Sequence, residues 1–447
     1  MNFETLKHML EQKQYFQLKK ELNTSQVFDI SEFLDELNAT NSLLIFRLLP
    51  KEIAADVFSR LSSESQEELC ELVNDKELKH IIDDLYFDDK IDLIEEMPAN
   101  VVKKIFKYST YTERKLINQF LNFPENTAGS LMTIEFVDLK KEMLVKNAMQ
   151  RIKQTAPDKE TVYTCYVIDA SRHLEGTISL KDLVLANENK TIEQLMHDDP
   201  IYVHTHHDQE YIADIFKKYD LLAVPVVDNE NRLIGIITID DIMDVIDSEN
   251  TEDFHKMAAI EPSDEEYIDS SIAKLSRKRI VWLLFLMISA SFTAYIIRSF
   301  EATLEEVVTL AAFIPLLMDT GGNAGAQAST IVIRSIVLGE VSPKDFLRVI
   351  FKEFRVSLLV GSVLSILNFL RVFFIEKQSW ELALTVSITL IFTIIVAKVI
   401  GGLLPLIAKK IKVDPAIMAS PVITTIVDAV ALVIYFYTAI WIMGLNF

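Results

Sequence analysis

The sequence predicts a multidomain membrane protein: an all-α superhelical N-terminal domain, an α/β repeat pair, a connecting helix and a five-helix all-α transmembrane domain. Three observations carry this prediction. Uncharged apolar runs long enough to span a membrane begin at Ile280. The net charge divides the chain into a strongly acidic part, −26 over residues 1–271, and a mildly basic part, +5 over residues 272–447. Between the helical N-terminus and the apolar runs, one α/β pattern occurs twice.

Residues 1–130 are expected to form the helical superhelix. Apolar residues recur at spacings of three and four, as in Ile53, Val57 and Leu61. Turn signals such as Leu49-Pro50 and Met97-Pro98 separate short helical segments at regular intervals. Arrays of short paired helices present a surface to a partner, which is here expected to be another part of the same chain.

Residues 131–190 and 191–248 are expected to form two copies of one α/β repeat. Each copy reads as strand, helix, β-branched strand, turn, strand and helix. The copies end in GTISLKDL from Gly176 and GIITIDDI from Gly235, 59 residues apart. This pattern resembles a tandem of cystathionine-β-synthase-type (CBS) domains, so the expected fold of this part is an α/β tandem CBS pair.

CBS pairs commonly bind adenine nucleotides such as ATP. The resemblance implies that the hydroxyl and carboxylate groups of Ser179, Asp182, Thr238 and Asp241 contact the ribose and phosphates. The alternative is that Ser179 and Thr238 cap the helices that follow them. The sequence leaves both interpretations open.

Residues 249–276 are expected to form a connecting helix between the repeats and the membrane. The stretch contains no glycine and a single proline, Pro262. Its first part is acidic, and Ile272 and Leu275 then lead into the basic sequence SRKR. A helix here would couple a cytosolic sensor to the transmembrane domain.

The transmembrane domain is expected over residues 277–447. The five apolar runs are 280–297, 307–333, 356–375, 382–408 and 416–443. Basic residues precede the first run and fill the loops after the second and fourth, whereas the opposite loops are acidic. Because basic loops stay in the cytosol, the N-terminal domains are expected inside, the C-terminus outside, and the protein in the cytoplasmic (inner) cell membrane as a multi-pass protein.

Two runs carry polar residues at membrane depth. The second is interrupted by Pro315 and by the polar, glycine-rich stretch from Asp319, where non-helical backbone is expected. In the last run, Ser420, Thr424 and Asp428 follow at intervals of four and share one helix face. A thin stripe of oxygen ligands on an apolar helix indicates a pore for a hard cation. The alternative is a polar helix contact with protonated Asp428.

Together these elements resemble the MgtE-type magnesium channel family over essentially the whole chain. The segments PLLMDTGGNAGAQ (315–327) and DPAIMASPVITTIVD (414–428) are similar to the family's signatures in the second and last spans. The resemblance implies a homodimeric channel that imports Mg²⁺, holds the hydrated ion at Asp428 and closes when cytosolic Mg²⁺ bridges acidic groups. The implied cytosolic sites are Asp56, Asp88 and Asp92 in the helical domain; Asp220, Asp241 and Asp244 in the CBS repeats; Glu249, Glu252 and Asp253 in the linker; and Asp414.

Two other function classes, a coupled carrier and an intramembrane protease, are alternatives to a channel. A carrier that couples Mg²⁺ to Na⁺ or H⁺ is compatible with the same spans. An intramembrane protease built on Asp319 and Asp428 would need neither the repeats nor the acidic region, so no enzyme activity is expected. The acidic charge also disfavours nucleic acid. The expected partners are a second copy of the chain and the lipid bilayer, with no obligatory protein partner evident.

Two further features do not fit the pore pattern. Lys398 is an unusual charge inside the fourth run, where it would either extend toward the cytosol or pair with a carboxylate. The histidines 204, 206 and 207 look like a metal cluster, but their place at a strand end favours a solvated surface over a transition-metal site.

Overall fold

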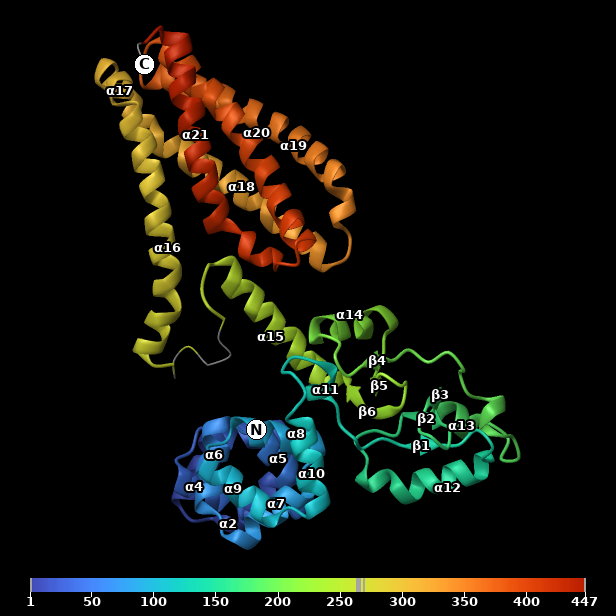
Figure 1. Ribbon diagram of the computed structural model, residues 1–447. Coiled ribbons are helices and arrows are strands. Elements are labelled where there is room, and N and C mark those ends of the chain that lie inside the picture. Colours follow the sequence, from blue (N-terminus) through green and yellow to red (C-terminus); the bar gives the residue numbers. More distant parts are fainter. Residues whose placement is uncertain (1, 263–266, 268–269, 446–447) are drawn as a thin grey trace. The chain divides into compact units, whose positions relative to one another are not determined.

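The computed structural model describes residues 2–262, 267 and 270–445 of the chain. The chain divides into two compact units, Met1–Ile246 and Asp247–Phe447. The first unit contains the helical N-terminal part and both α/β repeats, and the second contains the long apolar helices (Figure 1).

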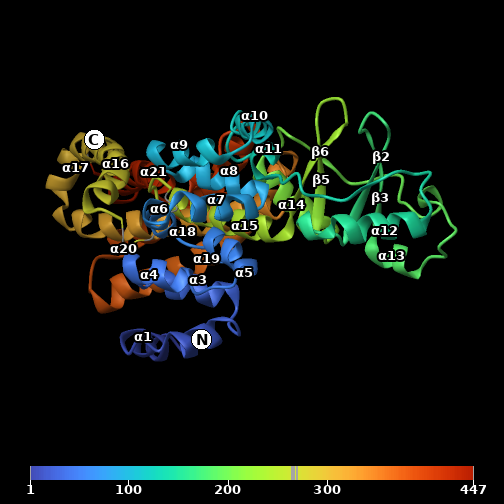
Figure 2. The same ribbon diagram turned by 90° about the horizontal axis from the view of Figure 1, so that it is seen from below.

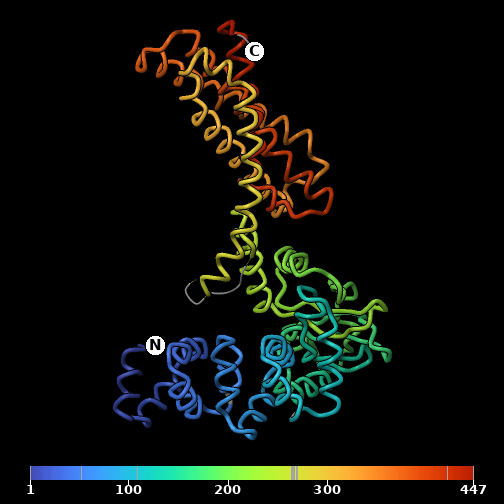
Figure 3. The backbone as a smooth tube through the Cα atoms, turned by 60° about the vertical axis from the view of Figure 1, so that its left-hand side comes forward, coloured from blue at the N-terminus to red at the C-terminus, as the bar shows by residue number. Residues whose placement is uncertain are grey.

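The N-terminal part is an array of short α-helices, as the sequence predicts. Several of these helices pack on the second helix after them, as α3 does on α5, α5 on α7 and α7 on α9, and Figure 3 shows the row of helices. Polar caps such as Ser62, Asn74 and Thr110, together with Pro50 and Pro98, mark the helix starts. The helices are α1 (Phe3–Glu11), α2 (Tyr15–Leu22), α3 (Val27–Asp35), α4 (Ala39–Phe46), α5 (Lys51–Ser59), α6 (Ser63–Leu72), α7 (Asp75–Asp84), α8 (Phe87–Glu96), α9 (Ala99–Tyr108) and α10 (Tyr111–Phe120).

The two repeats have the predicted order of strands and helices. In each repeat the first strand pairs in parallel with the second, and the second pairs antiparallel with the third. Figure 2 shows α12 and α13 along one side of β2 and β3. After α11 (Ala128–Leu131), the first repeat comprises β1 (Asp138–Leu139), α12 (Val145–Thr155), β2 (Thr164–Ile168), β3 (Leu174–Ser179) and α13 (Leu180–Leu185); the second comprises β4 (Val203–His204), α14 (Gln209–Tyr219), β5 (Ala223–Val227), β6 (Leu233–Thr238) and α15 (Ile239–Met257).

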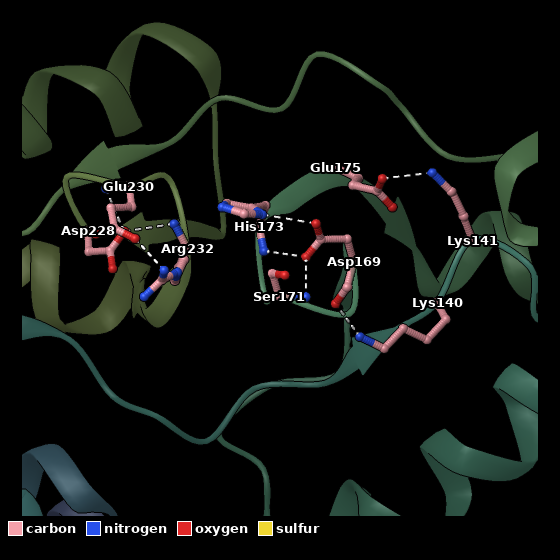
Figure 4. Close-up of polar contacts among 9 residues, drawn as sticks. All are labelled: Lys140, Lys141, Asp169, Ser171, His173, Glu175, Asp228, Glu230 and Arg232. Atoms are coloured by element: carbon pink, nitrogen blue, oxygen red, sulfur yellow. Dashed lines mark hydrogen bonds and ion pairs between the residues drawn. The ribbon is translucent and has the colours of Figure 1, made fainter.

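The two sheets meet at equivalent turns (Figure 4). In each turn one carboxylate, of Asp169 or of Asp228, accepts hydrogen bonds from the backbone N–H groups two and four residues later. Two backbone hydrogen bonds of 3.2 and 2.9 Å join one turn to the other. Because the same turn occurs in both repeats and pairs with its counterpart, the repeats are related by an approximate two-fold arrangement.

The second unit consists of helices, four of which are long and apolar enough to cross a membrane among the described residues. These four segments are Ile272–Ser299, Pro343–Ile375, Trp380–Lys410 and Pro415–Met443. The predicted count of five is therefore not confirmed. The elements are α16 (Ile272–Ser299), α17 (Glu301–Glu306), η3 (Val308–Phe313), α18 (Ile314–Val337), η4 (Pro343–Asp345), α19 (Phe346–Leu370), η5 (Arg371–Ile375), α20 (Trp380–Lys410), η6 (Pro415–Met418) and α21 (Ser420–Met443).

Helix α18 corrects the interruption predicted for the second apolar run. It is continuous through the polar stretch from Asp319, because Pro315 lies in its first turn, where a missing N–H group leaves no hydrogen bond unmade. Its glycines serve close packing. A Cβ atom on Gly322 would lie 2.9 Å from Cγ2 of Thr424, and one on Gly401 of α20 would lie 2.2 Å from the Gly325 carbonyl oxygen. The same polar residues lower the hydropathy of α18, which explains why it is not among the four apolar segments.

The connecting helix predicted over residues 249–276 also differs from the structure. Residues 249–257 are the second half of α15, and residues 272–276 are the first turn of α16. Neither glycine nor proline lies between Asp241 and Met257, and the last helix of the second repeat continues through this stretch. Ala259 then adopts left-handed backbone with φ of 53°, and Pro262 follows, so the helix cannot run on. Within the intervening stretch, residues 263–266 and 268–269 lie outside the described part.

Candidate functional site

An acidic cluster lies within the first unit, where the helical array meets the repeats. Its residues come from four segments: α8, the loop before β1, the loop before β2, and the first turn of α15. The oxygens of Asp88, Glu135 and Glu160 lie within 4.8 Å of one another. We call the whole set the α8 cluster; its members are Asp88, Asp89, Asp92, Glu135, Glu160 and Asp241.

Local structure holds the α8 cluster in place. The backbone N–H of Phe87, at the start of α8, donates to the carboxylate of Glu135 at 3.1 Å, which fixes that side chain over the helix N-terminus. The Thr238 hydroxyl donates to the carboxylate of Asp241 at 2.9 Å, at the start of α15. Carboxylates on four separated segments are thus brought to one place.

Burial and mutual repulsion disfavour the charged forms of these carboxyl groups. Burial, reinforced by neighbouring carboxylates, raises the pKa of Asp88 and Asp241 to about 7. The same causes raise the pKa of Asp89 to about 7 and that of Glu160 to about 8. Within the described residues, no member of the α8 cluster forms an ion pair with lysine or arginine within 4.0 Å. The cluster therefore favours binding of protons or a cation.

Two oxygens of the cluster are enclosed without a partner. Oδ1 of Asp88 and Oε2 of Glu160 are sealed from solvent and accept no hydrogen bond. Such an oxygen carries the full cost of lost hydration, on the order of 1–3 kcal/mol or more for a charged group. A divalent ion with oxygen ligands would remove that cost, and a ligand set made only of carboxylates suits a hard cation such as Mg²⁺ or Ca²⁺.

The predicted residues of the first unit are only partly brought together. Asp88, Asp92 and Asp241 lie in the α8 cluster, although Asp92 is more exposed than the other two. Asp56 is exposed beside it and lines a cavity of ≈ 480 Å³ that Glu135 also lines. Asp220 and Asp244 lie elsewhere: Asp220 is the exposed left-handed C-cap of α14, and Asp244 is exposed on α15.

Sequence reasoning missed Asp89, Glu135 and Glu160. The run FDDKID contains Asp89 and offered a signal, because Asp89 is adjacent to Asp88. The two glutamates are single residues in loops, and no spacing in the sequence relates them to α8. Their proximity to Asp88 becomes visible only in the folded unit.

The residues predicted for nucleotide binding have capping contacts. Ser179 is the N-cap of α13: its hydroxyl accepts from the Asp182 N–H at 3.0 Å and donates to the Asp182 carboxylate at 2.6 Å. Thr238, which is 5% exposed, makes the equivalent contact with Asp241 in the second repeat. The helix-capping interpretation is thus confirmed for Ser179, whereas Thr238 shares only the contact between hydroxyl and carboxylate, and nucleotide binding stays a prediction.

A second acidic site lies in the other unit, and a lysine occupies its centre. Lys256 of α15 pairs with Glu252 one turn earlier and with Asp414 before η6, where its Nζ is 2.6 Å from Oδ2. Partial burial lowers the pKa of Lys256, but the hydrogen bonds to the two carboxylates outweigh this effect and raise it above its ordinary value. The predicted pair Glu252 and Asp414 is thus brought together around an ammonium group, while Glu249 and Asp253 lie half-buried on the same helix.

The predicted pore residues lie on α21 beside α18. Asp428 and Thr424 are half-buried, and Asp319 of α18 acts electrostatically on Asp428. The Thr424 hydroxyl donates to the Pro421 carbonyl at 3.0 Å. The side chain of Ser420 lies outside the described part. Helix α18 thus adds a second carboxylate, that of Asp319, near Asp428. From the sequence alone, a role for the Asp319 carboxylate is considered only in a protease.

Family models match most of this architecture. The model of the MgtE divalent cation transporters matches residues 314–438, that of the MgtE intracellular N domain matches 25–126, and that of the CBS domain matches 192–248. These matches agree with the helical array, the second α/β repeat and helices α18–α21 described above.

Curated relatives and solved structures agree with the family models. The chain is 34% identical to the magnesium transporter MgtE of Thermus thermophilus over 92% of each chain. It is 32% identical to that of Bacillus subtilis, over 93% of this chain and 94% of the relative. Two solved structures each cover 55% of this chain with a TM-score of 0.52: the soluble part of a magnesium transporter (30% identity, 97% of that chain) and the cytosolic domain of the Mg²⁺ channel MgtE in complex with ATP (32%, 100%). The chain belongs to the MgtE family of divalent cation transporters.

Proposed function

We propose that this protein is a magnesium-selective channel that imports Mg²⁺ across the cytoplasmic membrane and closes when cytosolic Mg²⁺ binds its acidic sites. The α8 cluster is the observation that carries the sensing half of this proposal. Several carboxyl groups with pKa values raised to about 7–8 meet there without a paired cation. The transported ion and the sensed ion are the same, so the site closes a negative feedback loop.

The pore is proposed at Asp428. Mg²⁺ sheds its water reluctantly, so a site with one carboxylate and hydroxyl oxygens suits a hydrated ion better than a closed cage of ligands. Asp428 and Thr424 supply such oxygens on α21, with Ser420 as the third proposed ligand and Asp319 adding negative charge nearby. In a homodimer, each chain would contribute one Asp428 to a common pathway.

The closing signal follows from the segments that the α8 cluster joins. A cation bound there would contact the helical array through Asp88, the first repeat through Glu135 and Glu160, and the second through Asp241. A cation that is bound by all these segments has a higher affinity for the state in which they meet than for the state in which they are apart. Cation binding therefore shifts the equilibrium toward the state in which they meet. Helix α15 is continuous from Asp241 to Met257, so a movement of Asp241 on cation binding would be transmitted along the helix to Glu252.

We also propose that an adenine nucleotide such as ATP binds the CBS pair, because the related cytosolic domain of the Mg²⁺ channel MgtE was solved in complex with ATP. The half-buried Ser179 and Asp182 offer a hydroxyl and a carboxylate. Thr238 fits this role less well, because its hydroxyl is almost wholly buried and already donates to Asp241. Titration of the full-length protein with ATP, comparing Asp182→Asn with wild type, tests this assignment; equal affinity would remove Asp182 from the nucleotide site.

The transport proposal is tested by Mg²⁺ uptake into proteoliposomes. Wild type should take up Mg²⁺ without any Na⁺ or H⁺ gradient, and Asp428→Ala should reduce the initial rate by about a hundredfold, as expected when a charged ligand at membrane depth is removed. Asp345→Asn, which alters a carboxylate in the η4 turn, is the matched control. Uptake that requires a Na⁺ or H⁺ gradient would establish the carrier instead, and uptake unchanged by Asp428→Ala would remove Asp428 from the pathway.

A further inference from the structure

Two buried charges in the second unit are not used by the proposed transport mechanism. Glu353 on α19 is 8% exposed and Lys398 on α20 is 5% exposed, and within the described residues they are the two charged side chains that are almost wholly buried. They have opposite signs, and they lie on helices that pack along each other. The burial of Lys398 argues against the alternative in which its side chain extends toward the cytosol, because such a side chain would be exposed.

The packing of α19 on α20 brings the two residues to the same place. Gly402 follows Lys398 by one helical turn, so both share a face of α20. A Cβ atom on Gly402 would lie 3.1 Å from Cγ of Glu353, so the stem of Glu353 lies across this glycine. The ammonium group of Lys398 acts electrostatically on the carboxylate, as does Lys352, which is exposed and therefore screened by solvent. No direct ion pair within 4.0 Å joins Glu353 and Lys398 among the described residues, so the two charges act through space.

Either charge alone would be unfavourable in this position. A single buried ion loses its hydration without compensation, whereas two opposite ions in a region of low dielectric constant offset part of that loss. Removing one partner therefore leaves an uncompensated buried charge. Removing both leaves a polar or apolar interface that α19 and α20 can tolerate.

Close backbone packing links this pair to the proposed pore helix. Gly401 and Gly402 are consecutive on α20, and they face different neighbours. Gly401 packs against the backbone of Gly325 on α18, while Gly402 packs against Glu353. Gly322 of α18 in turn packs against Thr424, one helical turn before Asp428. A shift of α20 away from α19 would therefore be passed through α18 to the helix that carries Asp428.

We propose that Glu353 and Lys398 form a buried charge pair that holds α20 against α19 and thereby positions the Asp428 helix for cation passage. The two are positioning residues, since neither contacts the proposed ion path. This inference rests on the proposed transport function, but its test also measures the melting temperature, which does not depend on transport.

The test compares Lys398→Met, Glu353→Gln and the double variant in the full-length protein. Each single variant should lower the initial Mg²⁺ uptake rate by about tenfold, and the double variant should recover to within about threefold of wild type, because the effects of changing two interacting charges are non-additive. The half-saturating Mg²⁺ concentration should stay near the wild-type value in the double variant, because Asp428 is intact. Melting temperature in detergent should follow the same order, and Lys352→Gln, on the neighbouring exposed charge, should change neither quantity.

Lys398→His separates charge from packing. Imidazole has an ordinary pKa of about 6.5, so this variant should transport at pH 6 and lose uptake, relative to wild type, as the pH rises to 8. Lys352→His should keep the wild-type pH profile. Lys398→Arg should retain uptake.

The outcomes separate the two proposals. Single variants with normal uptake and normal melting temperature would overturn the charge pair, as would a double variant no better than the worse single one. A wild-type protein without Mg²⁺ uptake would overturn the proposed function, and the melting temperatures of the four proteins would still decide whether Glu353 and Lys398 interact.

Discussion

The protein contains two acidic sites outside its membrane helices, and they differ in how the repulsion between their carboxylates is offset. In the α8 cluster, carboxylates from the helical array and both repeats meet without an ion-paired lysine or arginine among the described residues. At Glu252 and Asp414, Lys256 lies between the carboxylates and pairs with both. We expect a proton or an external cation to complete the first site, whereas in the second the cation is the side chain of Lys256 itself.

This difference implies different responses to magnesium. A site whose carboxyl groups have raised pKa values gains stability when a divalent ion replaces the protons. A site that already holds an ammonium group must release it before a divalent ion can bind, so its apparent affinity is lowered by that competition. We therefore expect the α8 cluster to respond at lower Mg²⁺ concentrations than the Glu252–Asp414 site.

The largest expected effect comes from Asp241→Asn. This change removes one charge from the α8 cluster, so the variant should be more stable than wild type without Mg²⁺. It should also lose most of the Mg²⁺-induced stabilisation, which for a single site is about 2.7 kcal/mol at a hundredfold excess over Kd. Denaturant unfolding of the full-length protein with and without Mg²⁺ measures both quantities.

Asp182→Asn is the control for this experiment, because Asp182 holds the equivalent position in the first repeat but lies on α13, outside the α8 cluster. It should keep the full Mg²⁺ response. An Asp241→Asn protein that responds to Mg²⁺ as strongly as wild type would show that the cluster is not the sensing site.

The next largest effect is a pH dependence that Mg²⁺ removes. The pKa values of Asp88 and Asp241 lie at about 7 in the folded chain and near 3.8 in the unfolded chain, so the folded state binds more protons between these values. Stability from these groups is therefore fully present below about pH 4 and is lost as the pH rises through 7. Melting temperatures without Mg²⁺ should fall over this range, and the increase caused by Mg²⁺ should grow with pH. A Mg²⁺ response that is independent of pH between 5 and 8 would contradict proton–cation exchange at the cluster.

A smaller effect is expected for Lys256→Gln. Without the ammonium group, Glu252 and Asp414 retain their charges and lose the competing cation, so Mg²⁺ should bind this site about two- to fivefold more tightly, as expected for loss of one partly screened charge. Titration calorimetry in an Asp241→Asn background isolates this site from the α8 cluster. Lys274→Gln, which changes a basic residue at the start of α16, serves as the control, and equal affinity in the two variants would argue against competition by Lys256.

The smallest effect compares Ser179 and Thr238, the equivalent hydroxyl residues of the two repeats. Ser179→Ala should destabilise the protein by about 1 kcal/mol, the usual value of an N-cap, with no change in the Mg²⁺ response. Thr238→Ala should instead alter the Mg²⁺ response, since its hydroxyl holds Asp241 in the α8 cluster. Identical behaviour of the two variants in Mg²⁺ titrations would mean that the Thr238 hydroxyl has no role at the α8 cluster.

Much of the architecture could be predicted from local sequence. Spacings of three and four residues predicted the helices of the array, and the related segments that begin at Gly176 and Gly235 predicted both CBS repeats in the correct order. Uncharged runs located four apolar membrane segments. The interruption of the second run was a wrong prediction. Glycine and proline destabilise an isolated helix, but inside a helix bundle glycine allows close packing of neighbouring helices and proline is tolerated in the first turn. The end of α15 was missed because the helix continues across the predicted domain boundary.

The sequence by itself determined most of the helices, the two repeats and four long apolar segments, and it singled out Asp428 as a carboxylate inside the last apolar run. These properties depend on neighbours within a few residues. Only the tertiary structure brought Glu135 and Glu160 to Asp88, placed Lys256 between Glu252 and Asp414, and buried Glu353 near Lys398. The physical reason is that charge interactions and desolvation depend on distance in space and on burial, and neither is encoded in the spacing of residues along the chain.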